Sequence, residues 1–514
     1  MTVRRLIGFS GLFFAVLVLM LSAVPALAVQ ATNVAVSRVT PTNAIIVVKA
    51  DVTADVRVAY GTAPSALTSS KTSAAMSRHE VLLDGLAPSS TIYYQVTITD
   101  ISNPAYTITL PVRSFVSTRN DGQPFSFAVA GDNRPSGDTV EQPVNWGIIN
   151  TQLASGNLDL FLHVGDLIYG LPTDTLARNM SKYDGLFAVT SPVTASVPMY
   201  TAIGNHEFVG SANSRTGYQQ EFTLPVNNGA DAGTYGEHYY SFDHGDTHFI
   251  ALSTEIPGQE GMITGNQSLW LEQDLAASTK QWIVVYMHRP LFSGVHATDP
   301  WMSTANSVGQ QNKVDLHALF LQGGVDVVFE GHEHYYLRHV EDGIHYVITG
   351  GGGSPLHGLP VLKPGDAFAW SGYEHVKVDE TADSLRLSAI DTADSVKESI
   401  NLGAPAISLS QAGSYWAAYV DYVNRDLSVD YSLNNDGAGD AAGLQAVHLM
   451  ATNGVLPVTA MPLFAGDLAV GAAAQITIHY QVPIGVAVFR ATTFMTCNDL
   501  ARGTYAFPGP APVY

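Results

Sequence analysis

The pattern of hydrophobic and polar positions divides the chain into three stretches. Residues 30–118 carry short runs of β-branched and aromatic residues separated by Pro, Thr, Asp and Gly, which predicts an all-β module. Residues 122–400 alternate apolar runs with amphipathic stretches, which predicts βαβ units around a mostly buried sheet. Short strand patterns return over residues 404–514. The predicted fold is therefore multidomain, with a β-sandwich, an α/β domain and a second β-sandwich in chain order.

The first stretch contains strand patterns at residues 44–49 and 56–60. At residues 86–96, a Leu-x-Pro turn leads into a strand with Tyr93 and Tyr94, as in sandwich domains whose corner tyrosine bonds to backbone. This stretch resembles a fibronectin type III module. We interpret it as a spacer or packing partner, with binding of a carbohydrate or a surface as the alternative.

The last stretch predicts an immunoglobulin-like sandwich that follows a linker at Leu402-Gly403-Ala404-Pro405. Apolar and polar side chains alternate over residues 427–433, and residues 475–480 and 486–489 are further strand patterns. We interpret this domain as a spacer or as a unit that attaches the protein to a cell surface.

The N-terminus has the pattern of a secretory signal peptide. Arg4 and Arg5 precede an apolar run over residues 6–24, and Ala26-Leu27-Ala28 is a small-x-small cleavage pattern. This pattern predicts that residues 1–28 are removed and that the protein is secreted, periplasmic or on the cell surface. An uncleaved anchor is the alternative. No second apolar run approaches membrane-spanning length, so no integral membrane segment is expected after removal of the signal.

Composition narrows the range of partners. The 514 residues carry a formal net charge of −21, which argues against nucleic acid as the main partner. A phosphorylated substrate remains compatible with this charge, because bound metal ions can dominate the local field of a site. The chain has one cysteine, Cys497, which excludes an intrachain disulfide.

Five predicted strands of the central stretch end in residues that can bind metal ions. Because ligands in open α/β sheets gather beyond the carboxyl ends of the strands, these residues are expected to meet. The predicted strands cover residues 125–130, 159–164, 199–203, 282–287 and 325–329. The residues that follow them are Gly131-Asp132, Gly165-Asp166, Gly204-Asn205-His206-Glu207, His288 and Gly331-His332-Glu333-His334.

The donor types at these strand ends indicate a site for two metal ions. Carboxylate, amide and imidazole donors in this mixture suit Fe, Mn or Zn. The candidates are too many for one ion, and an aspartate at a central strand end, such as Asp166, can bridge two. Two metals at about 3.5–4 Å form a clamp for phosphoryl displacement. Each motif alone also fits a turn, a polar strand edge or a helix cap, but five successive strand ends together favour a site.

The order of these motifs is similar to that of a known family. Tyr169 follows Asp166 after two residues, and Gly204-Asn205-His206-Glu207, His288 and Gly331-His332-x-His334 come after it in turn. In the identity and order of these motifs, the central stretch resembles the calcineurin-like metallophosphoesterases. Within that family it is most similar to the purple acid phosphatase branch. In that branch a fibronectin-like domain precedes the catalytic domain. The resemblance implies a catalytic domain of sandwiched β-sheets flanked by helices.

The resemblance also implies a role for each matching residue. It implies that Asp166 bridges two metal ions, Fe(III) with Fe, Zn or Mn, and that a tyrosinate at Tyr169 binds the Fe(III). His206 would lie beside the phosphate and stabilise or protonate the leaving group. The implied ligands are Asp132, Asp166, Tyr169 and His334 for the first metal, and Asp166, Asn205, His288 and His332 for the second.

Three side chains are candidates for substrate binding, namely Arg134, His206 and His296. Arg134 departs from the family pattern in the first motif. It either binds a phosphate oxygen or forms an outward salt bridge. His296 follows His288 in a loop and is expected to reach the substrate, or else to be a surface residue. Phe292 stands where the family often has tyrosine, which removes one hydroxyl contact.

These implications predict an exported phosphatase that hydrolyses phosphomonoesters by attack of a metal-bound hydroxide. The expected partner is a small phosphorylated substrate. Asp166 and His206 are the predicted catalytic residues, the first as the bridge and the second to stabilise or protonate the leaving group. A phosphodiesterase acting on nucleotides or phospholipid headgroups is the enzymatic alternative. A cell-surface adhesion protein with a degenerate catalytic core is the alternative of a different class.

Overall fold

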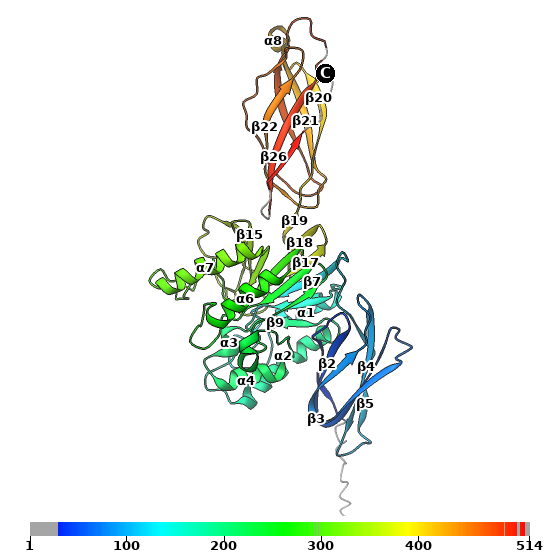
Figure 1. Cartoon of the computed structure of the whole chain (residues 1–514). Coiled ribbons are helices and arrows are strands. Elements are labelled where there is room, and N and C mark those ends of the chain that lie inside the picture. The colour runs from blue at the N-terminus through cyan, green and yellow to red at the C-terminus, as the bar shows by residue number, and fades with distance from the viewer. Residues whose placement is uncertain (1–28, 293, 297, 488, 501–503, 509–514) are drawn as a thin grey trace, which may run out of the picture.

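The computed structural model describes residues 29–508, with gaps at 293, 297, 488 and 501–503. The predicted signal peptide, 1–28, lies outside the described residues. An N-terminal β domain packs beside the central domain, and a C-terminal β domain extends away from it beyond the last strand of the central domain (Figure 1). The predicted order of β-sandwich, α/β domain and β-sandwich is confirmed.

The N-terminal domain is an antiparallel sheet system in which β2 pairs with β1, β3 and β4. The two strand patterns predicted at 44–49 and 56–60 belong to the single long strand β2. Its register with β3 shifts between Lys49 and Ala54, so an irregularity joins the two halves instead of a turn. The strands are β1 (Ala31–Ser37), β2 (Asn43–Gly61), β3 (Ser69–Asp84), β4 (Thr91–Asp100), β5 (Thr107–Thr109) and β6 (Arg113–Val116).

Polar contacts hold the N-terminal domain against the central domain. The hydroxyl of Tyr94 donates a hydrogen bond to the carbonyl of Ala195 at 2.6 Å. This differs from the corner tyrosine expected from the sequence, because the bond crosses to the central domain. Lys49 forms ion pairs with Asp184 at 2.6 Å and Glu221 at 2.5 Å. The domain is therefore docked as a packing partner.

The central domain contains two sheets. One has the order β19-β18-β17-β7-β8-β9, and the other has the order β10-β11-β12-β13-β15-β14-β16. Strands β7, β8 and β9 are parallel, as are β11, β12, β13 and β15. The strands are β7 (Phe125–Ala130), β8 (Leu160–His163), β9 (Met199–Thr201), β10 (Tyr240–His244), β11 (Thr247–Ala251), β12 (Trp282–Tyr286), β13 (Val327–Glu330), β14 (Tyr336–Glu341), β15 (Ile344–Thr349), β16 (Asp366–Trp370), β17 (Glu374–Thr381), β18 (Ser384–Asp391) and β19 (Val396–Gly403).

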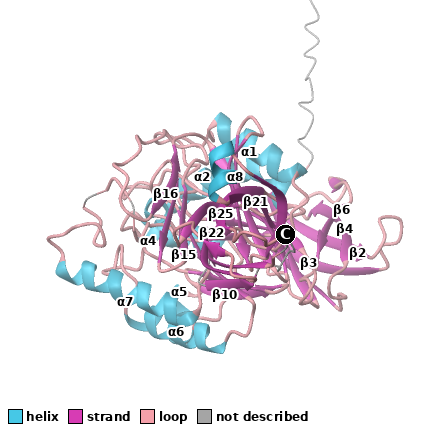
Figure 2. Cartoon of the chain, turned by 90° about the horizontal axis from the view of Figure 1, so that it is seen from above, coloured by secondary structure: helices cyan, strands magenta, loops and turns pink. Residues whose placement is uncertain are grey.

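The two central sheets share one core, because their facing aromatic rings interlock. Phe127 of the first sheet meets Phe249 of the second with ring centroids 5.1 Å apart. Helices cover the outer faces, with α1 and α2 on one side and α6 and α7 on the other (Figure 2). The helices are α1 (Val144–Ser155), α2 (Leu176–Thr194), α3 (Asn205–Phe208), α4 (Ala212–Glu221), the 3-10 turn η1 (Gly229–Asp231), α5 (Ala232–Tyr235), α6 (Gly265–Ala277) and α7 (Ser307–Gly323).

The C-terminal domain is a sandwich of two four-stranded sheets, β20-β21-β25-β23 and β24-β22-β26-β27. The strand predicted at 486–489 is wrong for positions 486, 487 and 489, which lie outside any strand, and position 488 lies outside the described residues. A turn at Ile484 and Gly485 interrupts the chain there, and the strand begins only at Ala491. The elements are β20 (Ile407–Tyr415), α8 (Tyr419–Asn424), β21 (Asp426–Asn435), β22 (Ala441–Ala451), β23 (Leu456–Pro457), β24 (Leu463–Leu468), β25 (Ala473–Gln481), β26 (Ala491–Asp499) and β27 (Thr504–Pro508). Among the described residues, no helix is long and apolar enough to cross a membrane.

Candidate metal centre

The two aspartates of the first motifs lie at one edge of the sheet. Ala130 pairs with His163 in the parallel β7–β8 ladder, so both strands end at the same level. Asp132 and Asp166 follow with left-handed backbones, at φ 58° and φ 57°. Aspartate tolerates this conformation better than most residues, and backbone strain of this kind gathers at functional sites.

Two glycines let the backbone approach these carboxylates. A Cβ at Gly204 would lie 2.5 Å from Oδ1 of Asp166, and a Cβ at Gly331 would lie 2.5 Å from Oδ2 of Asp132. No larger residue fits either position without displacing a carboxylate. The glycines of the strand-end motifs are therefore part of the site's construction.

Six predicted ligands converge at this edge, and we call them the strand-end cluster: Asp132, Asp166, Asn205, His288, His332 and His334. In one half, Oδ1 of Asn205 lies 2.9 Å from both Nε2 of His288 and Nδ1 of His332. Those two nitrogens are 3.2 Å apart. Oδ1 of Asp166 lies 3.3 Å from Nε2 of His288 and joins this half to the other.

The other half of the strand-end cluster contains two carboxylates and one imidazole. Ligand atoms of Asp132, Asp166 and His334 all lie within 4.8 Å of one another. Nε2 of His334 is 3.6 Å from Oδ1 of Asp132. Burial, together with the charge of Asp166, raises the pKa of Asp132 well above its usual range. A buried carboxylate pair of this kind is stabilised by a bound cation.

The three histidines of the cluster are oriented by their outer nitrogens. Nδ1 of His288 donates to the carbonyl of Val164 at 2.9 Å, and Nδ1 of His334 donates to the carbonyl of Pro355 at 2.7 Å. Nε2 of His332 lies 3.1 Å from Oδ2 of Asp299. The rings of His288 and His334 therefore turn their other nitrogens, as lone pairs, into the cluster, and Nδ1 of His332 faces the same way.

Inward lone pairs on neutral rings are what metal ligation requires. Burial lowers the pKa of His288 to about 3 and that of His334 to about 4, so both rings are neutral near pH 7. Without a cation, the lone pair of His288 Nε2 would face the oxygens of Asn205 and Asp166, which are both acceptors. The residues of the strand-end cluster fit two metal ions.

Glu207 positions the loop that carries Asp166, although its role was not predicted from the sequence. Its buried carboxylate accepts backbone N–H bonds from Asp166 at 2.8 Å, Leu167 at 2.7 Å and Ile168 at 3.1 Å. Burial and the charge of Asp166 raise the pKa of Glu207 to about 8. The signal was present, because Glu207 stands three residues after Gly204 as the acidic member of a capping box at α3.

Arg134 points into the site. Its Nε donates to Oδ2 of Asp166 at 3.0 Å, so the outward salt bridge considered from the sequence is not formed. Its guanidinium lies 5.3 Å above the ring of Tyr169. The ring of Tyr169 lies 4.8 Å from that of His206, whose backbone N–H donates to Oδ1 of Asp166 at 3.0 Å. Arg134 therefore contacts the carboxylate of Asp166, and the rings of Tyr169 and His206 lie next to Arg134 in turn. A metal bond to the Tyr169 hydroxyl stays a prediction.

A second group of donors adjoins the first, and we call His296, Glu333 and His357 the loop cluster. Nδ1 of His296 lies 2.9 Å from Oε1 of Glu333, and this hydrogen bond raises the pKa of His296. The ring of His296 is 4.4 Å from that of His332. The structure therefore brings the predicted substrate residue His296 to the edge of the strand-end cluster.

Three members of this neighbourhood were not predicted to have a role, namely Asp299, Glu333 and His357. Glu333 was visible inside the Gly-His-x-His motif. Asp299 and His357 lie outside helices and strands, where no periodic pattern marks them. His357 stacks on His334 with ring centroids 4.0 Å apart.

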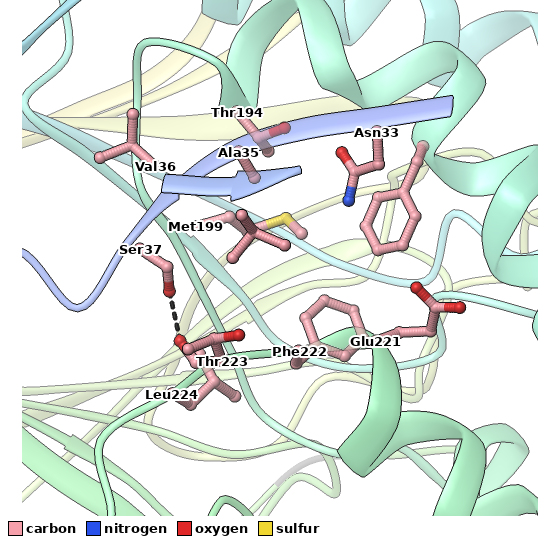
Figure 3. Close-up of a pocket in the computed structure, with 12 residues that line it drawn as sticks. Asn33, Ala35, Val36, Ser37, Thr194, Met199, Glu221, Phe222, Thr223 and Leu224 are labelled. Atoms are coloured by element: carbon pink, nitrogen blue, oxygen red, sulfur yellow. Dashed lines mark hydrogen bonds between the residues drawn. The ribbon is translucent and has the colours of Figure 1, made fainter. Parts of the chain in front are cut away.

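A pocket lies elsewhere, at the seam between the N-terminal and central domains (Figure 3). Asn33 and Val36 of β1 face Phe222 and the end of α4 across it. The hydroxyl of Ser37 donates to the carbonyl of Thr223. None of the predicted site residues lines this pocket, and its walls come from the interface between the two domains.

Comparison with known proteins agrees with this geometry. Residues 126–336 match the calcineurin-like phosphoesterase family. Purple acid phosphatase 23 of Arabidopsis thaliana is 28% identical over 51% of this chain and 57% of its own. Human acid phosphatase type 7 is 33% identical over 36% of this chain and 41% of its own. The chain thus spans about half the length of the curated relatives it matches.

A solved structure shows the same fold. The purple acid phosphatase from seeds of yellow lupin (Lupinus luteus) superposes with a TM-score of 0.60, at 18% identity, over 73% of this chain and 74% of its own. The family match covers both halves of the strand-end cluster, from the first aspartate to the last histidine. The central domain of this chain is therefore a calcineurin-like metallophosphoesterase domain, with purple acid phosphatases among its homologues and structural neighbours.

Proposed function

We propose that this chain is a metal-dependent phosphoric ester hydrolase that acts on phosphomonoesters. The observation that carries the proposal is the orientation of the strand-end cluster. His288 and His334 each turn a lone pair toward shared carboxylate and amide oxygens, with the outer nitrogen bonded to a backbone carbonyl, and His332 lies beside them. The family match and the purple acid phosphatase relatives support the same class of reaction.

The proposed cofactor is a pair of metal ions, Fe(III) with Fe, Zn or Mn. Asp132, Asp166, Tyr169 and His334 would hold the first ion, and Asp166, Asn205, His288 and His332 would hold the second. Two such ions supply an activated water and neutralise charge on phosphoryl oxygens. Glu207 contributes by fixing the backbone of Asp166, so that its carboxylate stays between the two halves.

His206 and Arg134 are proposed to act on the substrate ester from the side of the site that carries Asp166. His206 is held at that edge by its backbone bond to Asp166, and its ring is proposed to support the departing alkoxide. Arg134 carries a permanent charge and can exchange its bond to Asp166 for one to a phosphoryl oxygen. His296, beside His332, is proposed to contact the substrate from the opposite side.

Turnover assays distinguish the proposed reaction from its alternatives. Purified protein is expected to hydrolyse a chromogenic phosphomonoester faster than the matching diester. Faster hydrolysis of the diester would favour a phosphodiesterase for nucleotides or phospholipid headgroups. Stable metal binding without turnover of either ester would favour an adhesion protein with a degenerate core.

The identity of the first metal has a separate spectroscopic test. An Fe(III)–tyrosinate bond at Tyr169 would give a visible charge-transfer band. This band is expected in the purified protein and is expected to be lost in Tyr169→Phe, while total metal content is retained. A colourless, active enzyme with full metal occupancy would contradict the iron assignment alone.

We also propose that the protein is exported and attached to the cell surface through its C-terminal domain. The apolar segment at residues 6–24 supports export. Helix α8, at the end of that domain far from the central domain, exposes Tyr419 by 82% and Tyr422 by 51% (Figure 1). Cell fractionation tests the proposal. Tyr419→Ser/Tyr422→Ser is expected to shift the protein to the soluble fraction, whereas Val144→Ser, at an 81% exposed site on α1, is not.

A further inference from the structure

Glu333 stands between two predicted metal ligands, His332 and His334, but its carboxylate is bonded to a neighbouring loop. The side chain of Glu333 is 0% exposed. Its Oε1 accepts three hydrogen bonds, from the backbone N–H of Val295 at 2.8 Å, the backbone N–H of His296 at 3.1 Å and Nδ1–H of the His296 ring at 2.9 Å. One buried oxygen therefore holds both the main chain of this loop and the ring that it carries.

Glycine at position 294 lets the loop come this close to the carboxylate. A Cβ at Gly294 would lie 2.6 Å from Oε1 of Glu333, which is well inside the distance at which carbon and oxygen atoms can pack. Any larger residue would push the loop away from Glu333. The backbone N–H groups of Val295 and His296 would then lose their acceptor.

The contact with Glu333 decides which nitrogen of His296 is left for a substrate. Because a carboxylate accepts hydrogen bonds, Nδ1 of His296 carries the proton of this bond, and Nε2 is the nitrogen that remains. The side chain is 38% exposed, so a molecule that enters the site can reach it. The ring lies 4.4 Å from that of His332, a predicted ligand of the second metal. Nε2 of His296 is therefore available beside the proposed metal centre.

On the basis of the hydrolase function proposed above, we propose that Glu333 is a positioning residue, which holds the ring of His296 so that its Nε2 meets an oxygen of the phosphoryl group. A ring that is already held gives up little conformational freedom when phosphate binds, whereas a released ring must be ordered at that step. Glu333 acts here by accepting hydrogen bonds. A side chain that keeps an acceptor oxygen at the same place should therefore replace it.

Calorimetric titration of inorganic phosphate into the full chain with its metals bound tests this role without any turnover. Glu333→Leu is expected to weaken phosphate binding about tenfold, because the released ring must be ordered on binding. Glu333→Gln is expected to restore the affinity to within about threefold of the wild type, because it retains an acceptor oxygen. Its amide nitrogen fits the place of Oε2, 3.5 Å from Nδ1 of His357, since that nitrogen is itself an acceptor for the backbone N–H of His334.

A double variant shows whether Glu333 acts through His296. His296→Ala is expected to weaken phosphate binding, and the addition of Glu333→Leu to His296→Ala is expected to cost nothing further. A carboxylate that merely supported the neighbouring metal ligands would give an added loss in the double variant. That added loss, or equal phosphate affinity in the wild type and Glu333→Leu, would overturn the role of Glu333.

Gly294→Ala covers the case in which Glu333→Leu does not fold or loses metal. The added Cβ displaces the loop and leaves the carboxylate intact, so phosphate binding is expected to weaken only where His296 is present. Gly358→Ala is the matched control, at a loop position where an added Cβ meets nothing within 4 Å. Equal phosphate affinities in the two alanine variants would overturn the role of Glu333. A wild type that binds phosphate with the expected differences but hydrolyses no ester would contradict the proposed function alone.

Discussion

The strand-end cluster and the loop cluster use the same donor types but are built in different ways. In the strand-end cluster, ligands follow the ends of buried parallel strands, and acceptors such as the carbonyl of Val164 fix each ring. In the loop cluster, only Glu333 belongs to a strand-end motif. His296 and His357 come from loops, and the His296 side chain is half-exposed.

The difference indicates a division of labour. Ligands on buried strand ends cannot move without disturbing the core, so they suit chemistry that needs fixed distances. Side chains on loops can adapt to the substrate. We therefore expect substitutions in the strand-end cluster to remove activity and substitutions around it to change affinity.

The largest effect is expected for Asp166→Asn. This change removes the charge that joins both halves of the strand-end cluster. Because metal ions contribute several kcal/mol to such reactions, phosphomonoester turnover should fall by at least about a thousandfold. Asp121→Asn, at an exposed aspartate paired with Lys280, is the control and should retain activity. Equal activities in the two variants would contradict the proposal that the carboxylate of Asp166 bridges two metal ions.

His206→Ala should have the next largest effect. Loss of a general acid costs about 10²- to 10⁴-fold in rate, and metal content should stay that of the wild type. The loss should be larger for alkyl phosphates than for nitrophenyl phosphate, because a poor leaving group depends more on the proton. A loss that is the same for both esters would argue that His206 binds substrate without protonating the leaving group.

Asp299→Asn tests whether a loop residue supports the strand-end cluster. Oδ2 of Asp299 lies 3.1 Å from Nε2 of His332, and changes at such outer partners cost about 10- to 100-fold in metal affinity. The matched control is Asp342→Asn. There a carboxylate lies at the same 3.1 Å from Nε2 of His317, a ring outside both clusters. Competition with a chelator measures the affinities, and equal values in the two variants would contradict the assigned role.

The smallest of these effects is expected for Arg134→Gln. The arginine stays bonded to Asp166 without substrate, so its contribution is to binding. KM should rise by about tenfold, the value of one charged hydrogen bond, with kcat nearly unchanged. Arg178→Gln, at a surface pair with Asp138, is the control. A fall in kcat at constant KM would instead place Arg134 in the chemical step.

The sequence predicted the parts of the molecule that repeat a pattern. The strand predicted at 125–130 is β7 to the residue, and five strand ends marked the residues that form the strand-end cluster. Both predictions follow from short-range rules. Apolar runs form buried strands, and ligand-binding residues gather beyond the carboxyl ends of those strands. Strand β2 is one strand, although two were predicted. The register shift inside it has the same sequence pattern as a turn between two strands, so the sequence did not distinguish them.

Residues delivered by loops could not be placed from the sequence. Asp299 and His357 reach the site through long-range packing, which depends on distances that no local pattern encodes. Arg134 was recognised, but its direction was open until the structure placed its Nε 3.0 Å from Asp166. The strand predicted at 486–489 was wrong because a turn precedes this segment and β26 begins only at Ala491.

The central claim is that the strand-end cluster hydrolyses phosphomonoesters with two bound metals. Its most direct test is the rate of nitrophenyl phosphate hydrolysis by the full chain after metal removal and during stepwise return of Fe, Zn or Mn. We expect no turnover in the stripped protein and recovery as two equivalents are added, with no recovery in Asp166→Asn. Undiminished turnover in the stripped protein, or no turnover after full metal return to the wild type, would contradict the claim.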